Sequence, residues 1–238
     1  MNKVKQAIIM AAGLGSRMNP ITLTTPKPLV KVNGVRMIDT VIDALHKNDI
    51  YKIYIVVGYL KEQFYPLQKQ YPGVQIIENP YYNTCNNISS LYVARDYIED
   101  AIILDGDQII YNTAILFKDF DRSGYNSVWT DNETNEWLQT IDNNTKRVIG
   151  CSRTGGPKGW QLYSISRWNK QDALKLKKYV EIEFEVNKNT QIYWDDIAMF
   201  YYPNEFNLTI YPMTKKDIIE IDDYKKLVSI DPSYATHF

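Results

Sequence analysis

The sequence has little of several features that would each define a class of protein. Its 238 residues include only two cysteines, Cys85 and Cys151, which are far apart and in no metal-binding spacing. Two cysteines cannot form a disulfide framework, and their scarcity is typical of a reduced, cytoplasmic protein. The formal net charge is −1, so the chain lacks the basic excess of a general nucleic-acid binder. No apolar run reaches membrane-spanning length, and we expect no membrane association.

Histidine is equally scarce, whereas aromatic residues are abundant. There are two histidines, His46 and His237, against 19 tyrosines and 5 tryptophans. Ordinary core packing would explain this number of rings, and so would an aromatic-lined ligand pocket. The positions of the tryptophans have to decide between these two explanations.

The first half of the sequence alternates apolar runs with amphipathic segments. The runs at residues 5–10, 50–59, 74–80 and 101–110 predict buried parallel strands. Between them, the spacing of apolar residues over 38–45 and the polar start of the segment 86–98 predict helices. This alternation predicts an α/β fold with a doubly wound, Rossmann-like, mostly parallel sheet.

The second half has a different character. Short apolar segments are separated by Asn, Asp and Gly turns, which predicts a small antiparallel portion. A helix is expected from about residue 169 to 180, and a strand entering a helix over 217–230. No linker or repeat interrupts the chain, so we expect a single domain of residues 1–238 whose character changes near residue 125.

A glycine-rich turn follows the first apolar run, in AIIMAAGLGSRM at residues 7–18. It lacks the Gly-Lys-Ser/Thr of a Walker A loop, and Met18 and Asn33 stand where a dinucleotide fingerprint needs a small residue and an acid. A nucleotidyltransferase loop fits better, because TPKPLV brings Lys27 shortly after Arg17. Glycines let the backbone approach a triphosphate, and the two bases would neutralise charge on the α-phosphate and the leaving pyrophosphate.

The whole stretch AAGLGSRMNPITLTTPKPLV, residues 11–30, resembles the signature of nucleoside-triphosphate transferases with a sugar-nucleotide pyrophosphorylase fold. The segments VVGYLKEQF, NNISSLYVA, TNEWL, YWDD and IIEIDDYKKL are similar to the bacterial CTP:phosphocholine cytidylyltransferases. These matches extend from residue 7 to about residue 228. The resemblance implies that residues 1 to about 125 form the CTP-binding half and residues from about 126 to 238 the acceptor-binding half.

Acidic residues end the predicted strand at ILDGDQI, where side chains of an open α/β sheet face the ligand crevice. By the resemblance, Asp107 and the Asp195 of YWDD are ligands of Mg²⁺, with Asp196 as the alternative to Asp195. Two carboxylates suffice, since Mg²⁺ also takes phosphate oxygens and waters. Asp105 is expected to orient the nucleotide loop.

The expected catalytic residues are Lys27 and Arg17. The other nucleotide-binding residues expected are Ala11, Ala12, Gly13, Gly15, Ser16, Asn86 and Asn87. For Asn86 and Asn87, capping of the helix that they precede is an equal alternative to contact with the base.

A quaternary ammonium group cannot donate a hydrogen bond, so proteins surround it with aromatic faces and carboxylates. The expected acceptor-binding residues are Glu136, Trp137, Trp160, Tyr193 and Trp194. Trp129 and Trp168 are expected in the core, and the alternative for the other rings is that they too fill the junction between the sheets.

The resemblance implies attack by a phosphocholine oxygen on the α-phosphorus of CTP, giving CDP-choline for a cell-surface glycan and releasing pyrophosphate. The nucleophile is already anionic, so no general base is needed. The residues leave open another acceptor, namely 2-aminoethylphosphonate, phosphoethanolamine, an amino-acid phosphate or a sugar 1-phosphate. They also leave open a non-catalytic nucleotide-binding regulator, a homodimer, and a fusion to an enzyme of the same pathway.

Overall fold

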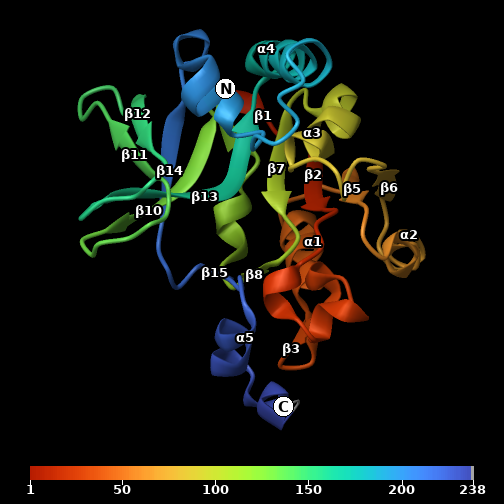
Figure 1. Ribbon diagram of the computed structural model, residues 1–238. Coiled ribbons are helices and arrows are strands. Elements are labelled where there is room, and N and C mark those ends of the chain that lie inside the picture. Colours follow the sequence, from red (N-terminus) through yellow and green to blue (C-terminus); the bar gives the residue numbers. More distant parts are fainter. Residues whose placement is uncertain (237–238) are drawn as a thin grey trace.

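The computed structural model describes residues 1–236, so His237 lies outside the described residues. The first half of the chain forms four parallel strands, β2 (Gln6–Ala11), β5 (Ile53–Val57), β6 (Val74–Glu78) and β7 (Ala101–Asp105). They lie side by side in the order β7-β2-β5-β6 (Figure 1). The expectation of a doubly wound, mostly parallel arrangement in this half is confirmed.

Helices cover both faces of these strands. Alternate residues of a strand point to opposite faces, so Ile9 of β2 packs with α1 (Met37–Lys47). The neighbouring Ile8 belongs to the opposite core, which contains residues of α3 (Ile88–Ala94) and α4 (Lys170–Glu181). Because both faces are covered, β2 is buried along its whole length.

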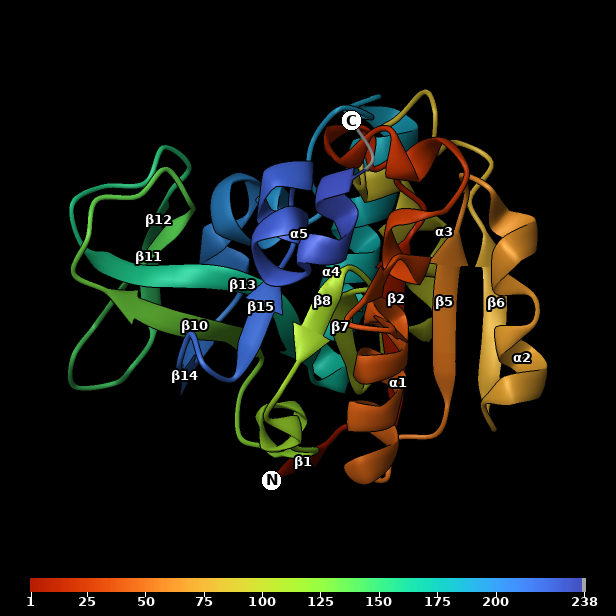
Figure 2. The same cartoon turned by 90° about the horizontal axis from the view of Figure 1, so that it is seen from below.

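The second half adds antiparallel strands to the same sheet, as expected. The antiparallel strands are β10 (Gly124–Thr130), β11 (Leu138–Ile141), β12 (Val148–Ser152) and β13 (Gly159–Trp168), and a further strand, β14 (Thr209–Met213), pairs in parallel with β10. The long β13 joins the two halves, because one of its ends pairs with β7 and the other with β11. The resulting nine-stranded sheet has the order β12-β11-β13-β7-β2-β5-β6, while β10 pairs with β13, and β14 pairs with the other edge of β10 (Figure 2).

The expectation of one continuous strand over 101–110 is wrong, because the structure has two strands there. The chain turns at Gly106 and Asp107, so β7 ends at Asp105 and a separate strand, β8 (Gln108–Ile110), leaves the main sheet. β8 pairs with β15 (Ile218–Glu220), which leads into α5 (Tyr224–Ile230). The C-terminal segment is thereby brought back to the acidic end of β7.

The remaining elements are short. β1 (Asn2–Lys3) pairs with β9 (Asp119–Phe120), and β3 (Lys31–Val32) pairs with β4 (Val35–Arg36). The helical segment after β5 is divided by Pro66 into a 3₁₀ turn (Lys61–Phe64) and α2 (Leu67–Gln70). Within the described residues, every helix is too short or too polar to cross a membrane.

Candidate active site

Two neighbouring clefts open where the parallel strands β2 and β7 end. The first has a volume of about 280 Å³ and the second about 360 Å³. The two clefts share five of their lining residues, namely Arg17, Asn87, Asp105, Asp107 and Asp222. Since the clefts share these side chains, they are two parts of one continuous site.

The first cleft contains the glycine-rich turn. Of the expected residues, those that line it are Ala11, Ala12, Gly13, Gly15, Ser16, Arg17, Lys27, Asn87, Asp105 and Asp107. Gly15 has a φ of +64°, and a Cβ there would lie 2.9 Å from the Cβ of Lys27. A side chain at this position would therefore strain the backbone and push Lys27 away from the turn.

Lys27 lines the first cleft and is nearly buried. Its Nζ lies 2.6 Å from Oδ2 of Asp107 and 3.6 Å from Oδ1 of Asp222. Burial alone would lower the pKa of Lys27, but the charges of Asp107 and Asp222 outweigh it and raise the pKa above its ordinary value. Lys27 therefore carries a full positive charge at neutral pH.

Arg17 lies on the open side of the same network. Its Nη2 is 3.2 Å from Oδ1 of Asp222, and 71% of its side chain is exposed. Asp222 thus bridges the two bases that the sequence predicted as catalytic. An exposed guanidinium on a long side chain is free to reach an anionic ligand in the cleft.

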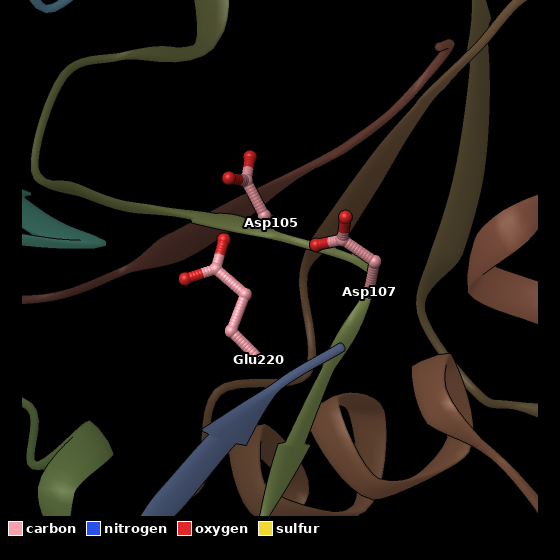
Figure 3. A group of neighbouring side chains, drawn as sticks. All are labelled: Asp105, Asp107 and Glu220. Carbon is pink, nitrogen blue, oxygen red and sulfur yellow. The ribbon is translucent and has the colours of Figure 1, made fainter. Parts of the chain in front are cut away.

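Three carboxylates meet beside Lys27. Oxygen atoms of Asp105, Asp107 and Glu220 all lie within 4.8 Å of one another. Figure 3 shows Asp105 and Asp107 close together on one segment, with Glu220 beside them at the end of β15. Burial and the charge of Asp107 raise the pKa of both Asp105 and Glu220 well above the ordinary range. Excess negative charge in a confined volume is typical of a site that receives a cation.

The YWDD segment contributes one of its two acids to the site. Asp195 lines the second cleft, and burial with the neighbouring Asp196 raises its pKa to about 7. Asp196 instead accepts hydrogen bonds from Arg153 and from the backbone N–H of Tyr193. Of the two adjacent acids, Asp195 therefore lines the cleft, whereas Asp196 holds Arg153 and the backbone of Tyr193.

Among the aromatic residues expected in the acceptor pocket, Trp137 and Tyr193 line the second cleft, together with Glu136. Trp194 does not line it. It is 2% exposed and packs against Tyr125 and Trp168, because the turn that follows Tyr193 directs the next side chain into the core. The expectation for Trp194 is corrected accordingly.

Trp160 is also displaced from its expected position. It lies on β13 opposite Trp129 of β10, and the centres of their rings are 5.4 Å apart. This cross-strand pair lines neither of the two clefts. Both Trp129 and Trp168 were expected in the core. Trp168 is fully buried, but Trp129 is 45% exposed, so the expectation for Trp129 is wrong.

The two asparagines before α3 also differ. Asn87 lines both clefts, and its Oδ1 accepts a hydrogen bond from the backbone N–H of Trp194. Asn86 lines neither cleft, and its Nδ2 donates to the carbonyl of Gln191. Neither asparagine forms the expected side-chain cap of α3, and the side-chain amide of Asn86 instead joins two loops.

Sequence reasoning missed several polar residues of the site. Ser90 lines the first cleft, Ser164 and Glu220 line the second, and Asp222 lines both. The only signal for them was the acidic segment IIEIDD at residues 218–223, at the end of an expected strand. Its pairing with β8 was invisible in the sequence because it joins segments that are more than 100 residues apart.

Comparison with known proteins places this geometry in a family. Residues 7–140 match the model of the MobA-like NTP transferase domain. The chain is 38% identical to the 2-aminoethylphosphonate cytidylyltransferase of Lancefieldella rimae, over 96% of this chain and 93% of the relative. It is 34% identical to the choline-phosphate cytidylyltransferase of Streptococcus pneumoniae, over 94% and 97% of the two chains.

A solved structure of the Streptococcus pneumoniae CTP:phosphocholine cytidylyltransferase superposes with a TM-score of 0.89 at 31% identity. The superposition covers 97% of this chain and 99% of the other. The likeness therefore includes both clefts and the C-terminal segment that returns to them. The chain belongs to the MobA-like NTP transferase family of nucleotidyltransferases, together with bacterial cytidylyltransferases that it resembles along nearly its whole length.

Proposed function

We propose that the protein transfers the cytidylyl group of CTP to a phosphorus-bound oxygen of a small aminoalkyl phosphate or phosphonate. The observation that carries this proposal is the junction of the two clefts. The first has a glycine-rich turn and two bases, and the second has aromatic rings and carboxylates. The two meet at Asp107, which accepts a hydrogen bond from Lys27, and a transferred phosphorus atom would have to lie there.

In this proposal the triphosphate occupies the first cleft and the acceptor occupies the second. Residues 1 to about 125 then contribute most of the nucleotide site, and residues from about 126 to 238 most of the acceptor site. Asp222 is the main exception, because it contacts Arg17 and Lys27 from the C-terminal segment. We expect its carboxylate to be displaced from Arg17 when phosphates enter the cleft.

The residues present fit a divalent cation. Oδ1 of Asp107 and Oδ1 of Asp195 are both buried, and neither accepts a hydrogen bond from the described residues. These are the two carboxylates that the sequence predicted as Mg²⁺ ligands, and oxygen is the donor that Mg²⁺ prefers. When bound there, the ion would neutralise charge on the phosphates.

The chain's own residues supply the rest of the chemistry. An anionic acceptor oxygen forms the new bond to the α-phosphorus while the bond to the bridging oxygen breaks, and pyrophosphate leaves with that electron pair. No proton has to move, so no general base is required. Lys27 is held in place by Asp107 and is positioned to offset the charge that accumulates during transfer.

Two acceptor chemistries are supported by different residues. Trp137 and Tyr193 favour the quaternary ammonium of phosphocholine, since aromatic faces attract such a group. Glu136, Glu220 and Asp222 favour a primary ammonium, as in 2-aminoethylphosphonate, since carboxylates accept its hydrogen bonds. A nucleotide-binding regulator without activity is disfavoured, because Arg17, Lys27, Asp107 and Asp195 all line the same continuous site.

Release of pyrophosphate tests the proposed function. The protein is incubated with Mg²⁺ and CTP, and in turn with phosphocholine, phosphoethanolamine, 2-aminoethylphosphonate and glucose 1-phosphate. We expect release with at least one aminoalkyl acceptor, little with glucose 1-phosphate, and little when ATP, GTP or UTP replaces CTP. Absence of release with every acceptor, or equal release with the sugar phosphate, would contradict the proposal.

A further inference from the structure

A fixed positive charge stands behind the aromatic wall of the second cleft. Arg153 follows β12, and its guanidinium carbon lies 3.9 Å from the ring centre of Phe200 and 6.0 Å from that of Trp137. Trp137 lines the cleft, whereas Arg153 is not among the residues that line it. A ring that could hold a ligand cation is therefore already in contact with a cation of the protein.

The guanidinium is held in this place by a buried acid. Its Nη2 and Nε donate to Oδ1 of Asp196 at 2.6 and 3.1 Å. Asp196 is only 3% exposed, and its Oδ2 accepts the backbone N–H of Tyr193 at 2.9 Å. Arg153 thus cannot leave without stranding a buried carboxylate, so its charge is a permanent part of the wall.

Three rings meet beside Arg153, of which Trp137 and Tyr193 line the cleft and Phe200 does not. The ring centre of Trp137 lies 5.1 Å from that of Phe200 and 5.8 Å from that of Tyr193, both in edge-to-face contact. Arg153 covers Phe200 and approaches Trp137 while it remains ion-paired with Asp196, so both rings already contact a cation of the protein. A second cation placed against Trp137 should therefore be held less strongly than by a ring without such a partner.

This arrangement affects the two acceptor chemistries unequally. A quaternary ammonium depends on aromatic faces, because it has no N–H group to donate. A primary ammonium has three donors and can bind instead to Glu136, Glu220 or Asp222 in the same cleft. Given the proposed function, we propose that Arg153 is a specificity-determining residue that favours primary-amine acceptors and disfavours trimethylated ones.

Two matched substrate pairs test this inference. Phosphoethanolamine is compared with phosphocholine, and 2-aminoethylphosphonate with its N-trimethyl derivative, so that each pair differs only in methylation. For the wild type we expect a higher kcat/KM with the primary amine in each pair. In Arg153→Met, which removes the charge, the ratio of trimethylated to primary acceptor should rise about tenfold. Arg153→Lys, which keeps the charge, should retain the wild-type ratio.

Controls separate specificity from stability. Arg147→Met removes an exposed charge next to β12 and outside both clefts, and it should leave the ratio unchanged. If Arg153→Met does not fold, Arg153→Gln is measured instead, because it can still donate to Asp196 without a charge.

An unchanged ratio in an active, folded Arg153→Met or Arg153→Gln protein would overturn the inference. So would an equal loss with all four acceptors in the Met and Lys variants, since that indicates a purely structural role. If the wild type used no acceptor at all, the proposed function itself would fail. Failure of the proposed function can be distinguished from failure of this inference, because it would already be seen with the wild type before any variant is made.

Discussion

The two clefts of the site are built in different ways. The first takes its glycine-rich turn and both bases from one stretch, residues 10–28, which follows a strand buried on both faces. Besides the residues that it shares with the first, the second cleft takes its lining from distant segments around Trp137, Ser164, Tyr193 and Glu220. One contiguous glycine-rich stretch supplies the turn and the bases of the first cleft, whereas strand pairing across long distances fixes the shape of the second.

This difference suggests a division between reaction and selectivity. Groups that contact the transferred phosphorus should be intolerant of change, because their effect is exerted in the transition state. Groups of the second cleft should alter which acceptor binds, with smaller effects on turnover. The following predictions test that division.

The largest effect is expected from Lys27→Ala. Loss of a buried charge that stabilises the transition state should lower kcat about 1000-fold. Binding of CTP, measured by calorimetry, should weaken only about threefold, because Arg17 and the turn remain. Lys158→Ala, an exposed change in the loop 154–159, serves as the control. Near-normal turnover in Lys27→Ala would remove this residue from the mechanism.

The second effect concerns stability at the junction of the clefts. Burial, with the charge of Asp196, raises the pKa of Asp195 in the folded protein to about 7, so the folded state favours the neutral acid. The stability that this group contributes is present below its unfolded pKa of about 4 and is lost as the pH rises to about 7. The loss in free energy of unfolding is at most about 4 kcal/mol. Asp105 and Glu220 shift in the same direction.

Urea unfolding at pH 5 and pH 8, in the absence of divalent ions, measures this loss. Asp195→Asn should lose less stability than the wild type over the same interval, because an amide does not ionise. Glu133→Gln, in an exposed loop, should behave as the wild type. If the stability of Asp195→Asn and of the wild type depended on pH in the same way, the pKa of Asp195 would be the same in the folded and unfolded states, which contradicts the prediction.

The third effect tests whether Asp107, which lines both clefts, is a ligand of Mg²⁺. Asp107→Asn should raise the Mg²⁺ concentration needed for half-maximal activity at least about tenfold, since it removes one of the two proposed ligands. Addition of Mg²⁺ should raise the Tm of the wild type and have little effect on that of Asp107→Asn. A Tm that rises equally in both proteins would place the ion elsewhere.

The smallest effect is expected in the second cleft. Trp137→Ala should raise the KM for phosphocholine about tenfold, with little change in kcat or in CTP binding, because a quaternary ammonium depends on aromatic faces. Trp160→Ala is the matched control, because this tryptophan lies in a cross-strand pair outside both clefts. Equal effects of the two changes on the acceptor KM would contradict the boundary that we draw for the acceptor site.

Sequence reasoning succeeded where the signal was local. The glycine turn and Lys27 could be predicted to lie together because they occur within a short stretch of chain, and both line the first cleft. The parallel strands and the helices between them followed from apolar periodicity. The antiparallel character of the second half was also predicted, although the pairing of its strands was not.

Sequence reasoning failed where the position of a side chain depends on a distant partner. Trp194 occurs in a segment that resembles an acceptor site, and Trp160 was expected to add a further ring, yet a turn buries the first and a strand pairing places the second outside both clefts. Glu220 and Asp222 join the site only because β15 pairs with β8. The role of Arg153 likewise depends on Asp196, which is 43 residues away.

The central claim is that an acceptor in the second cleft attacks the α-phosphorus of a triphosphate in the first. Phosphorus-31 NMR of a reaction containing CTP, Mg²⁺ and 2-aminoethylphosphonate tests it directly. The account predicts free pyrophosphate and an equal amount of a product whose two different phosphorus atoms are coupled through one bridging oxygen. CMP with pyrophosphate and no such product, or CDP with a phosphorylated acceptor, would contradict it.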